Sequence, residues 1–164
     1  MLTENGKKWI KYIGNTNLGA STYKKTDGND IDFYQYTPDN IRAHMGNTNY
    51  NTPPASETYA GGTEWGKWIG IGTGDTAESA SDYCLDNFVS LTFVSASASN
   101  VMGLTNLTMT YQNDTQSSVT IKEIGLYLTM SGWQFLFARK VLSTPITIPV
   151  GQSRAFTVHI DINS

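Results

Sequence analysis

The chain has 164 residues, a length that suits one domain and is sufficient to enclose a hydrophobic core. Its low content of charged residues, 15 %, and its net charge of −3 exclude a basic surface for nucleic acid and a cluster of Lys and Arg for an anionic membrane. Polar character comes instead from Asn, Thr, Ser and Gly, a composition typical of β-structure with many turns.

The N-terminal residues contain no apolar run of signal-peptide length, and no segment reaches the roughly eighteen apolar residues of a membrane span. Cys84 is the single cysteine, so no internal disulfide can form. We expect Cys84 to be a small buried apolar residue rather than a reactive thiol. These features together predict a protein that is made and folded in a cytoplasm.

Short elements are expected at the start of the chain. The segment 7–14 (KKWIKYIG) is predicted as a strand. The segment 21–37 is predicted as a hairpin, because Asp27–Gly28 is a favoured turn dipeptide between two alternating runs. No segment of the chain shows a clear apolar stripe at the helical period of 3.6 residues.

A long irregular segment, 38–66, follows and is rich in Asn, Thr, Gly and Pro. Such a stretch is uncommon in a compact domain unless it is functional or disordered. It contains Tyr50, Tyr59 and Trp65, and disordered linkers are poor in aromatic residues. We therefore interpret residues 1–67 as short strands plus an extended arm that is ordered by contact with a partner.

Residues 68–164 are predicted to form the core of the fold as a run of antiparallel strands. Leu107, Met109 and Tyr111 alternate with polar residues, which is the period of a half-buried strand. Similar runs separated by short turns lie at 88–96, 104–112, 119–129, 133–142, 144–153 and 154–163. The sequence therefore predicts an all-β protein, an antiparallel, jelly-roll-like β-sandwich with a long irregular N-terminal half, and we expect the whole chain to be one cooperative domain.

The segment 69–83 (IGIGTGDTAESASDY) carries glycines at alternate positions, Gly70, Gly72 and Gly74. A dinucleotide-binding fingerprint needs the spacing G-x-G-x-x-G, and a phosphate-binding P-loop needs Lys directly after its last glycine. Neither pattern is present, and the two acidic residues that follow would repel a phosphate. The segment is therefore predicted as a strand with small residues on one face, followed by a turn that joins the arm to the sandwich.

No metal, cofactor or catalytic site is predicted. His44 and His159 stand far apart and lack the spacing of metal ligands. The segment 27–32 (DGNDID) has three carboxylates without the loop length of an EF-hand, so a solvated hairpin tip is preferred and a weak calcium site is the alternative. No nucleophile motif occurs, and the acidic residues are scattered, so the protein is not expected to be an enzyme.

Glu123 is an acidic residue between apolar residues of a predicted strand, and Arg139 lies within another apolar run. We predict a structural ion pair between them; a functional buried acid and a charge that points out of the bulge are the alternatives for Glu123. The apolar phase of the strand slips between Ile121 and Ile124, next to Gly125, which predicts a β-bulge.

The aromatic residues and the alternate glycines suggest a contact surface, because an arm can lie across a neighbour and glycines allow close approach of another backbone. The candidate interface residues are Tyr50, Tyr59, Trp65, Trp68, Gly70, Gly72 and Gly74. A glycan-binding module is an alternative, since Trp and Tyr side chains on a β-scaffold can stack on sugars.

The order of several motifs resembles that of small β-sandwich structural proteins in the virions of tailed bacteriophages. In those proteins a G-x-G, small residues and a Leu precede a strand with I-x-E-I/V-G-L, a strand with L/F-A-R-x-V-L, P-I-T-I-x-x-G and a closing alternating strand. The matching positions here are Gly72, Gly74, Leu85, Ile121, Glu123 to Leu126, Phe137 to Arg139, Val141, Leu142, Pro145 to Ile148 and Gly151. The resemblance covers roughly the last three-fifths of the chain, residues 68–163.

This resemblance implies an oligomeric virion subunit of tail or neck type, without enzymatic activity or cofactor, that binds copies of itself and other virion proteins. A capsid decoration protein, a head-fibre protein and a module for host surface glycans are the alternatives. The implied location is the virion, after synthesis in the bacterial cytoplasm, with neither nucleic acid nor membrane as a partner.

Overall fold

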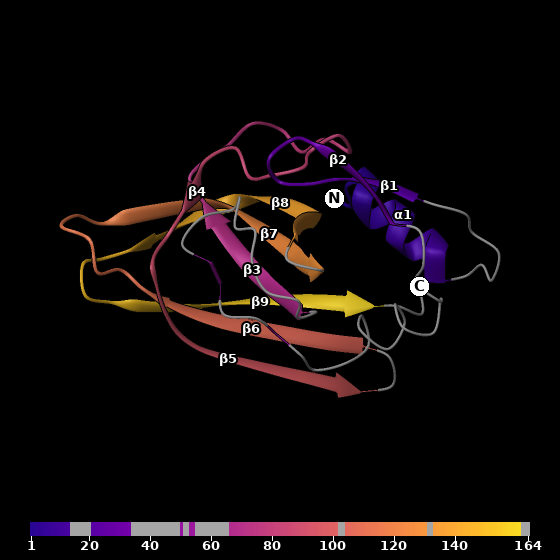
Figure 1. Ribbon diagram of the computed structural model, residues 1–164. Helices are drawn as coiled ribbons and strands as arrows, with labels where there is room; N and C mark the ends of the chain where they lie inside the picture. The colour runs from indigo at the N-terminus through magenta and orange to yellow at the C-terminus, as the bar shows by residue number, and fades with distance from the viewer. Residues whose placement is uncertain are drawn as a thin grey trace.

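The computed structural model describes residues 1–13, 21–33, 50, 53–54, 66–101, 104–130 and 133–161. The elements are α1 (Glu4–Ile13), β1 (Ser21–Lys24), β2 (Asp30–Phe33), β3 (Gly66–Gly72), β4 (Phe88–Val89), β5 (Thr92–Val101), β6 (Leu104–Gln112), β7 (Val119–Met130), β8 (Trp133–Ile148) and β9 (Ser153–Asp161). The described chain is nearly all β, and its antiparallel sheets pack together in a sandwich-like arrangement, which confirms the predicted fold class (Figure 1).

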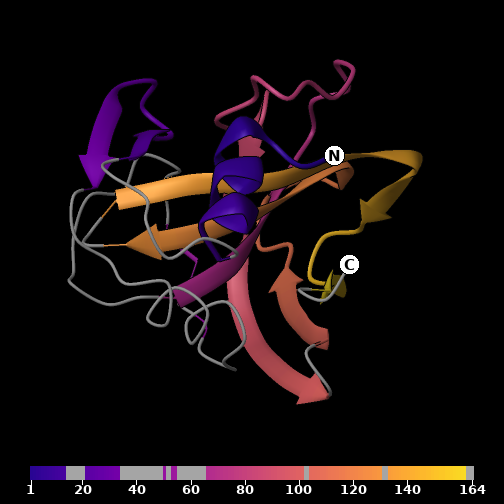
Figure 2. The same cartoon turned by 90° about the vertical axis from the view of Figure 1, so that its right-hand side faces the viewer.

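Two larger sheets form the body of the molecule. One has the strand order β4-β3-β7-β8, the other has the order β5-β6-β9, and β1-β2 form a separate hairpin. Every pairing between these strands is antiparallel. Figure 2 shows that the strands of the two larger sheets run in clearly different directions where they pack.

The core lies between these sheets. From β6, Tyr111 donates its hydroxyl hydrogen to the carbonyl of Ile69 in β3, and the Ile69 amide donates to the sulfur of Met109 at 3.2 Å. The predicted alternation of β6 is confirmed, because Leu107, Met109 and Tyr111 are all buried. Burial of the Tyr111 phenol also raises its pKa.

The strand β3 is buried on both faces. Ile69 and Ile71 belong to the hydrophobic core, and so does Trp68, whose ring stacks on Tyr127 at a centroid distance of 4.1 Å. The Trp68 indole N–H also donates to Gln134 Oε1 at 2.6 Å. A strand covered on both sides explains why the sequence of β3 lacks a polar face.

The N-terminal segment differs from its prediction: α1 is a helix where a strand was expected. Thr3 precedes it as the N-cap, since the Gly6 amide donates to Thr3 Oγ1 at 3.1 Å. The Thr3 hydroxyl in turn donates to the carbonyl oxygens of Leu136 and Phe137, at 2.7 and 3.0 Å. The apolar residues in the sequence of α1 do recur at the helical period, which the prediction overlooked, and the helix is further stabilised by docking on β8.

Replacement of Thr3 by Val is expected to lower the free energy of unfolding by about 1–2 kcal/mol. Val keeps the shape of Thr but removes the cap acceptor and the buried donor that links α1 to β8. Urea unfolding measures the loss. Thr3→Ser retains the hydroxyl and should lose clearly less; equal losses in the two variants would contradict the capping role.

The strand β8 also differs from its prediction, because 133–148 form one strand rather than two. Four residues, 142–145, lie between the partners of Ile121 and Glu123 on β7, and one residue, Phe137, is extra between the partners of Leu126 and Tyr127. Pro145 is tolerated because it falls in the unpaired stretch. The predicted bulge near Ile121 is therefore confirmed, and the second irregularity coincides with the Phe137 carbonyl that accepts from Thr3.

The predicted hairpin is confirmed over its described part, 21–33, with Gly28 at a φ of 82° in its turn. It packs on the start of β8, where the Lys25 ammonium lies 3.9 Å from the centroid of the Trp133 ring and the Thr26 amide donates to the Gln134 carbonyl at 3.2 Å. Segment 34–37 and most of the predicted arm lie outside the described residues.

Candidate functional site

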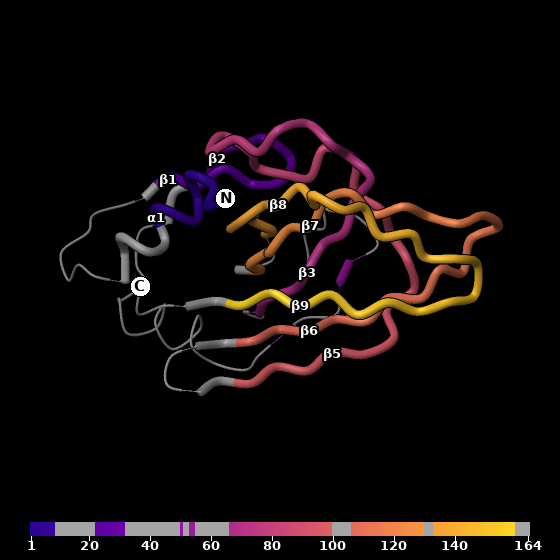
Figure 3. The backbone as a smooth tube through the Cα atoms, turned by 180° about the vertical axis from the view of Figure 1, so that it is seen from behind, coloured from indigo at the N-terminus to yellow at the C-terminus, as the bar shows by residue number. Residues whose placement is uncertain are grey.

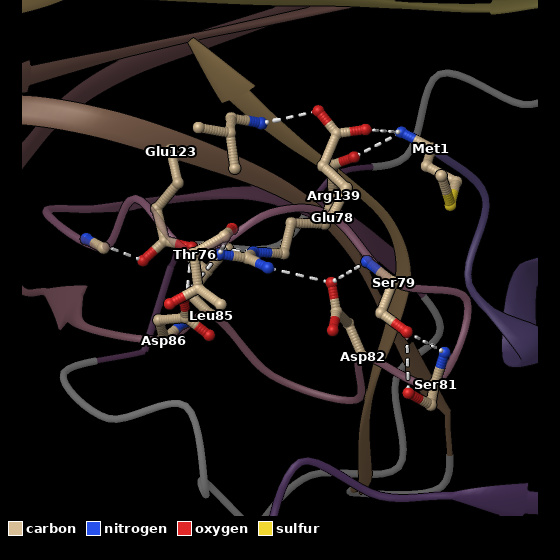
Figure 4. Close-up of polar contacts among 12 residues, drawn as sticks. Met1, Thr76, Glu78, Ser79, Ser81, Asp82, Leu85, Asp86, Glu123 and Arg139 are labelled. Atoms are coloured by element: carbon tan, nitrogen blue, oxygen red, sulfur yellow. Dashed lines mark hydrogen bonds and ion pairs between the residues drawn. The ribbon is translucent and has the colours of Figure 1, made fainter.

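The densest polar cluster in the described chain surrounds the buried guanidinium of Arg139 on β8 (Figure 4). Its Nε donates to Glu123 Oε2 at 2.8 Å, so the ion pair predicted from the sequence is present. Its Nη1 donates to Asp82 Oδ2 at 2.9 Å. Its Nη2 donates to Asp86 Oδ2 at 2.8 Å and to the Thr76 carbonyl at 3.1 Å. Four hydrogen bonds thus tie β8 to β7 and to the 73–87 loop.

Glu123 is fully buried and completes the same cluster from β7. Its carboxylate accepts hydrogen bonds from the backbone amides of Gly74 at 3.0 Å, Asn87 at 2.9 Å and Asp86 at 3.2 Å. With Arg139, it therefore has four donors. The first and last parts of the 73–87 loop are held against one carboxylate.

The alternate glycines create the space for this cluster. On the same face of the sheet, Gly72 pairs with Glu123, and Gly70 pairs with Gly125, which in turn pairs with Arg139. A Cβ on Gly72 or Gly74 would lie 2.5 Å from Glu123 Oε1, closer than real Cβ atoms approach other atoms. A Cβ on Gly70 would lie 2.6 Å from Cε2 of Tyr127.

These distances correct the predicted role of the glycines. The group that comes close to them belongs to this chain, not to a neighbouring subunit. Trp68 is fully buried, and Gly70 and Gly72 are buried as well, so these three candidate interface residues form part of the interior. Gly74 is only half-buried, but its amide is used by Glu123.

The charges of the cluster are unequal, with one guanidinium facing the carboxylates of Asp82, Asp86 and Glu123. Burial alone would lower the pKa of Arg139, but its hydrogen bonds to Asp82 and Glu123 and the charges of Glu123 and Asp86 raise it. The guanidinium is therefore charged at neutral pH. Backbone amides offset part of the excess negative charge at Glu123.

Glu78 adds a second anchor at the edge of the cluster. Its carboxylate accepts from the N-terminal ammonium of Met1 at 2.9 Å and from the Val141 amide at 2.9 Å, and Lys140 Nζ lies 3.2 Å away. Partial burial alone would raise the pKa of Glu78, but the hydrogen bonds from Met1, Val141 and Lys140 lower it to about 2. The loop is thereby fastened to both the N-terminus and β8.

The arrangement is suited to holding a loop rather than to transforming a substrate. The Glu123 carboxylate is inaccessible to solvent, and it accepts hydrogen bonds from Arg139 and three backbone amides. A catalytic acid must reach the proton that it transfers. The geometry therefore favours the structural interpretation of Glu123 over the catalytic one.

The remaining candidate residues do not assemble into one site. Tyr50 is 43 % exposed and forms a parallel backbone bridge to Lys67, whereas Tyr59, Trp65 and His44 lie outside the described residues. His159 is exposed on β9, as predicted, and its Nδ1 contacts Asn106 Oδ1.

Cys84 is half-buried rather than fully buried.

The carboxylates of the hairpin tip have partners within the hairpin. The Asp27 carboxylate accepts hydrogen bonds from the Lys25 ammonium and the Asn29 amide, and Asp30 forms an ion pair with Lys24. The hydrogen bond from the Asn29 amide is the main cause that lowers the pKa of Asp27. In the part of the chain that the structure describes, no group of three or more His, Cys, Asp and Glu side chains could hold a metal ion. No described helix is long and apolar enough to cross a membrane.

Three functional groups of the cluster were missed by the sequence prediction: Asp82, Asp86 and the Thr76 carbonyl. Asp82 also accepts from the Ser79 amide at 2.9 Å, which closes a turn in the loop. Their sequence signal is weak, since acidic residues in a serine-rich segment are usual in solvated turns.

Asn113 is a further fully buried polar residue that the sequence did not single out. It joins two turns, because its side-chain amide donates to the carbonyls of Ser117 and Ile148, at 2.9 and 2.8 Å. Its own backbone amide donates to Gln152 at 2.9 Å. The turn from β6 to β7 lies at the end of the sandwich opposite α1 (Figure 3), and the hydrogen bonds of Asn113 stabilise that turn.

Comparison of this chain with protein-family models, with curated proteins and with solved structures gives no match.

Proposed function

We propose that the protein is a structural protein of a bacteriophage virion, an oligomeric subunit of tail or neck type that assembles by protein–protein contacts. In this proposal it is made in the bacterial cytoplasm, acts in the particle without catalysis or cofactor, and has copies of itself and other virion proteins as partners. Capsid decoration and head-fibre proteins are variants of the same structural role.

One observation carries the proposal: motif residues that are far apart in the sequence meet in one structural cluster. Gly72 and Gly74 come from the G-x-G motif, Glu123 from I-x-E-I-G-L, and Arg139 from F-A-R-x-V-L. The residues that carry the resemblance therefore form one cluster that holds the 73–87 loop on the sheet. A structural role for these residues supports the proposal that the protein acts through its shape and surfaces.

The glycan-binding alternative receives less support from the described residues. Trp68 is stacked on Tyr127 in the interior, so its ring offers no platform for a sugar. Tyr50 is the one candidate aromatic residue that the structure places at the surface. A glycan array with the wild-type protein and with Tyr50→Ala tests this alternative; hits that disappear in the variant would favour it.

Mass spectrometry of purified particles tests the main proposal, using a phage whose genome encodes this chain. The expected result is that the chain copurifies with intact particles in a fixed ratio to the major capsid protein. Its absence from particles, together with its presence in the lysate, would overturn the proposal. Cryo-electron microscopy of the same particles would then distinguish tail, neck and head positions.

A further inference from the structure

The strand β5 forms an open edge of the three-stranded sheet. The sheet order β5-β6-β9 leaves β5 bonded to β6 on one side, and β5 lies at the lower border of the molecule from the front and from behind (Figures 1 and 3). Among the described residues, no strand or isolated bridge pairs with its other side. An edge strand presents unpaired N–H and C=O groups that can pair with another chain.

The other edges of the two sheets are protected in ways that β5 is not. The β9 edge carries Arg154, His159 and Asp161 in its sequence, β4 has only two residues, and the β8 edge is met by a bridge from Leu2 to Ala138. By contrast, β5 (TFVSASASNV) has ten residues and contains neither a charged residue nor Pro. Charges, Pro and short length are the usual means by which soluble proteins prevent pairing at an edge.

The side chains along β5 leave room for a neighbouring strand. Ser95, Ser97 and Ser99 are exposed on the outer face, whereas Ala96 and Ala98 are half-buried. Val94 is 49 % exposed at the register shift between Phe93 and Ser95. No charged side chain is therefore present on β5 to oppose the approach of another strand.

The sequence of the edge is complementary to itself. Residues 95–99 read Ser-Ala-Ser-Ala-Ser in both directions. In an antiparallel pair centred on Ser97, each serine would face a serine on the outer face and each alanine an alanine on the inner face. No like charges would oppose each other, and the same patch would serve both copies, as a two-fold interface requires.

We propose that β5 pairs with β5 of a second copy of this chain, antiparallel and centred on Ser97, so that two three-stranded sheets become one six-stranded sheet. The partner is a second copy rather than another protein because the edge is palindromic and uncharged. This inference goes beyond the proposed function, since such a dimer can form whether or not the chain is part of a virion.

Sedimentation of two matched lysine variants of the full chain tests the proposal. One row of paired residues crosses the outer face of the sheet, from Ser97 on β5 through Thr108 on β6 to Thr157 on β9. Its two end residues, Ser97 and Thr157, are both exposed and lie on opposite edge strands. The wild-type protein is expected to be a dimer. Ser97→Lys places two ammonium groups opposite each other at the two-fold axis and should weaken the dimer by roughly tenfold or more. Thr157→Lys adds the same charge two strands away and should leave the dimer intact.

Each outcome decides the proposal. A wild-type monomer would overturn it, and so would equal weakening by both variants, which would place the contact on the outer face rather than at the edge. A dimer that Ser97→Lys leaves unchanged would also overturn it. Hydrogen exchange gives a second measurement: amides of 92–101 should be protected in the wild-type protein and exchange faster in Ser97→Lys, while those of 153–161 stay the same. Thermal unfolding establishes that both variants are folded.

Discussion

Replacement of Arg139 by Met is expected to destabilise the protein by about 3–5 kcal/mol, because it leaves the fully buried Glu123 carboxylate without its counter-ion. Met fills much of the space of the Arg side chain, so the loss comes mainly from the uncompensated charge and not from a cavity. The variant also removes the contacts that hold Asp82 and Asp86. Urea unfolding at neutral pH measures the change.

Two further variants separate the buried charge from other effects. Glu123→Gln combined with Arg139→Met removes both charges, so the double variant should lose less than the sum of the single variants. Lys122→Met is the matched control on the neighbouring strand β7, because Lys122 forms an exposed ion pair with Asp75 at 2.7 Å and its loss should have no measurable effect. A loss below about 1 kcal/mol for Arg139→Met would contradict the buried-pair argument.

The same variant should release the 73–87 loop. The variant removes the contacts of Arg139 to Thr76, Asp82 and Asp86, whereas Glu123 can still accept from the Gly74 and Asn87 amides near the two ends of the loop. A loop without these contacts opens more often than the sheets that it covers. The expected result is cleavage within 73–87 by a protease that leaves the wild-type protein intact under the same conditions.

The sequence predicted the fold class and the central ion pair because both depend on simple rules. Alternating apolar residues indicated strands such as β6, and two charged residues within apolar strands, Glu123 and Arg139, had to be compensated if they were buried. The register of β7 on β8 then brings them to the same face. Local pattern and the cost of buried charge were sufficient for these predictions.

The wrong predictions have two causes. The apolar residues of α1 recur at the helical period, so this helix could have been predicted from the sequence, whereas the anchoring of its cap, Thr3, by the carbonyls of Leu136 and Phe137 could not. The glycines of β3 were assigned to an interface because the sequence shows that something must come close to them but not what it is. In the structure, it is the side chains of Glu123 and Tyr127.

Lowering the pH is expected to reveal a separate contribution from Glu78, of roughly 1–3 kcal/mol, because solvent screens its exposed partners Met1 and Lys140 and so reduces the full value of the pKa shift. The pKa of this carboxyl is lowered from 4.5 to about 2 in the folded protein, and each pKa unit corresponds to about 1.4 kcal/mol. A lowered pKa means that the stabilisation is fully present above the unfolded-state value. It is lost as the pH falls from about 4.5 to about 2.

The difference in unfolding free energy between the wild-type protein and Glu78→Gln measures this contribution. Gln keeps the shape and can still accept the hydrogen bond from the Val141 amide, but it cannot ionise. The advantage of the wild-type protein should therefore be large near neutral pH and should disappear near pH ~2. Other carboxyl groups titrate in both proteins, so their effect largely cancels in the difference.

Lys140→Met refines the interpretation, since it removes the most exposed of the three partners and retains the carboxylate, the N-terminal ammonium and the Val141 amide. The pH-dependent advantage over Glu78→Gln should then become smaller without disappearing. A difference that stays constant across the acidic range would show that Glu78 stabilises the protein through packing or neutral hydrogen bonds. The ammonium of Met1 would then not be the group that fastens the 73–87 loop to the N-terminus.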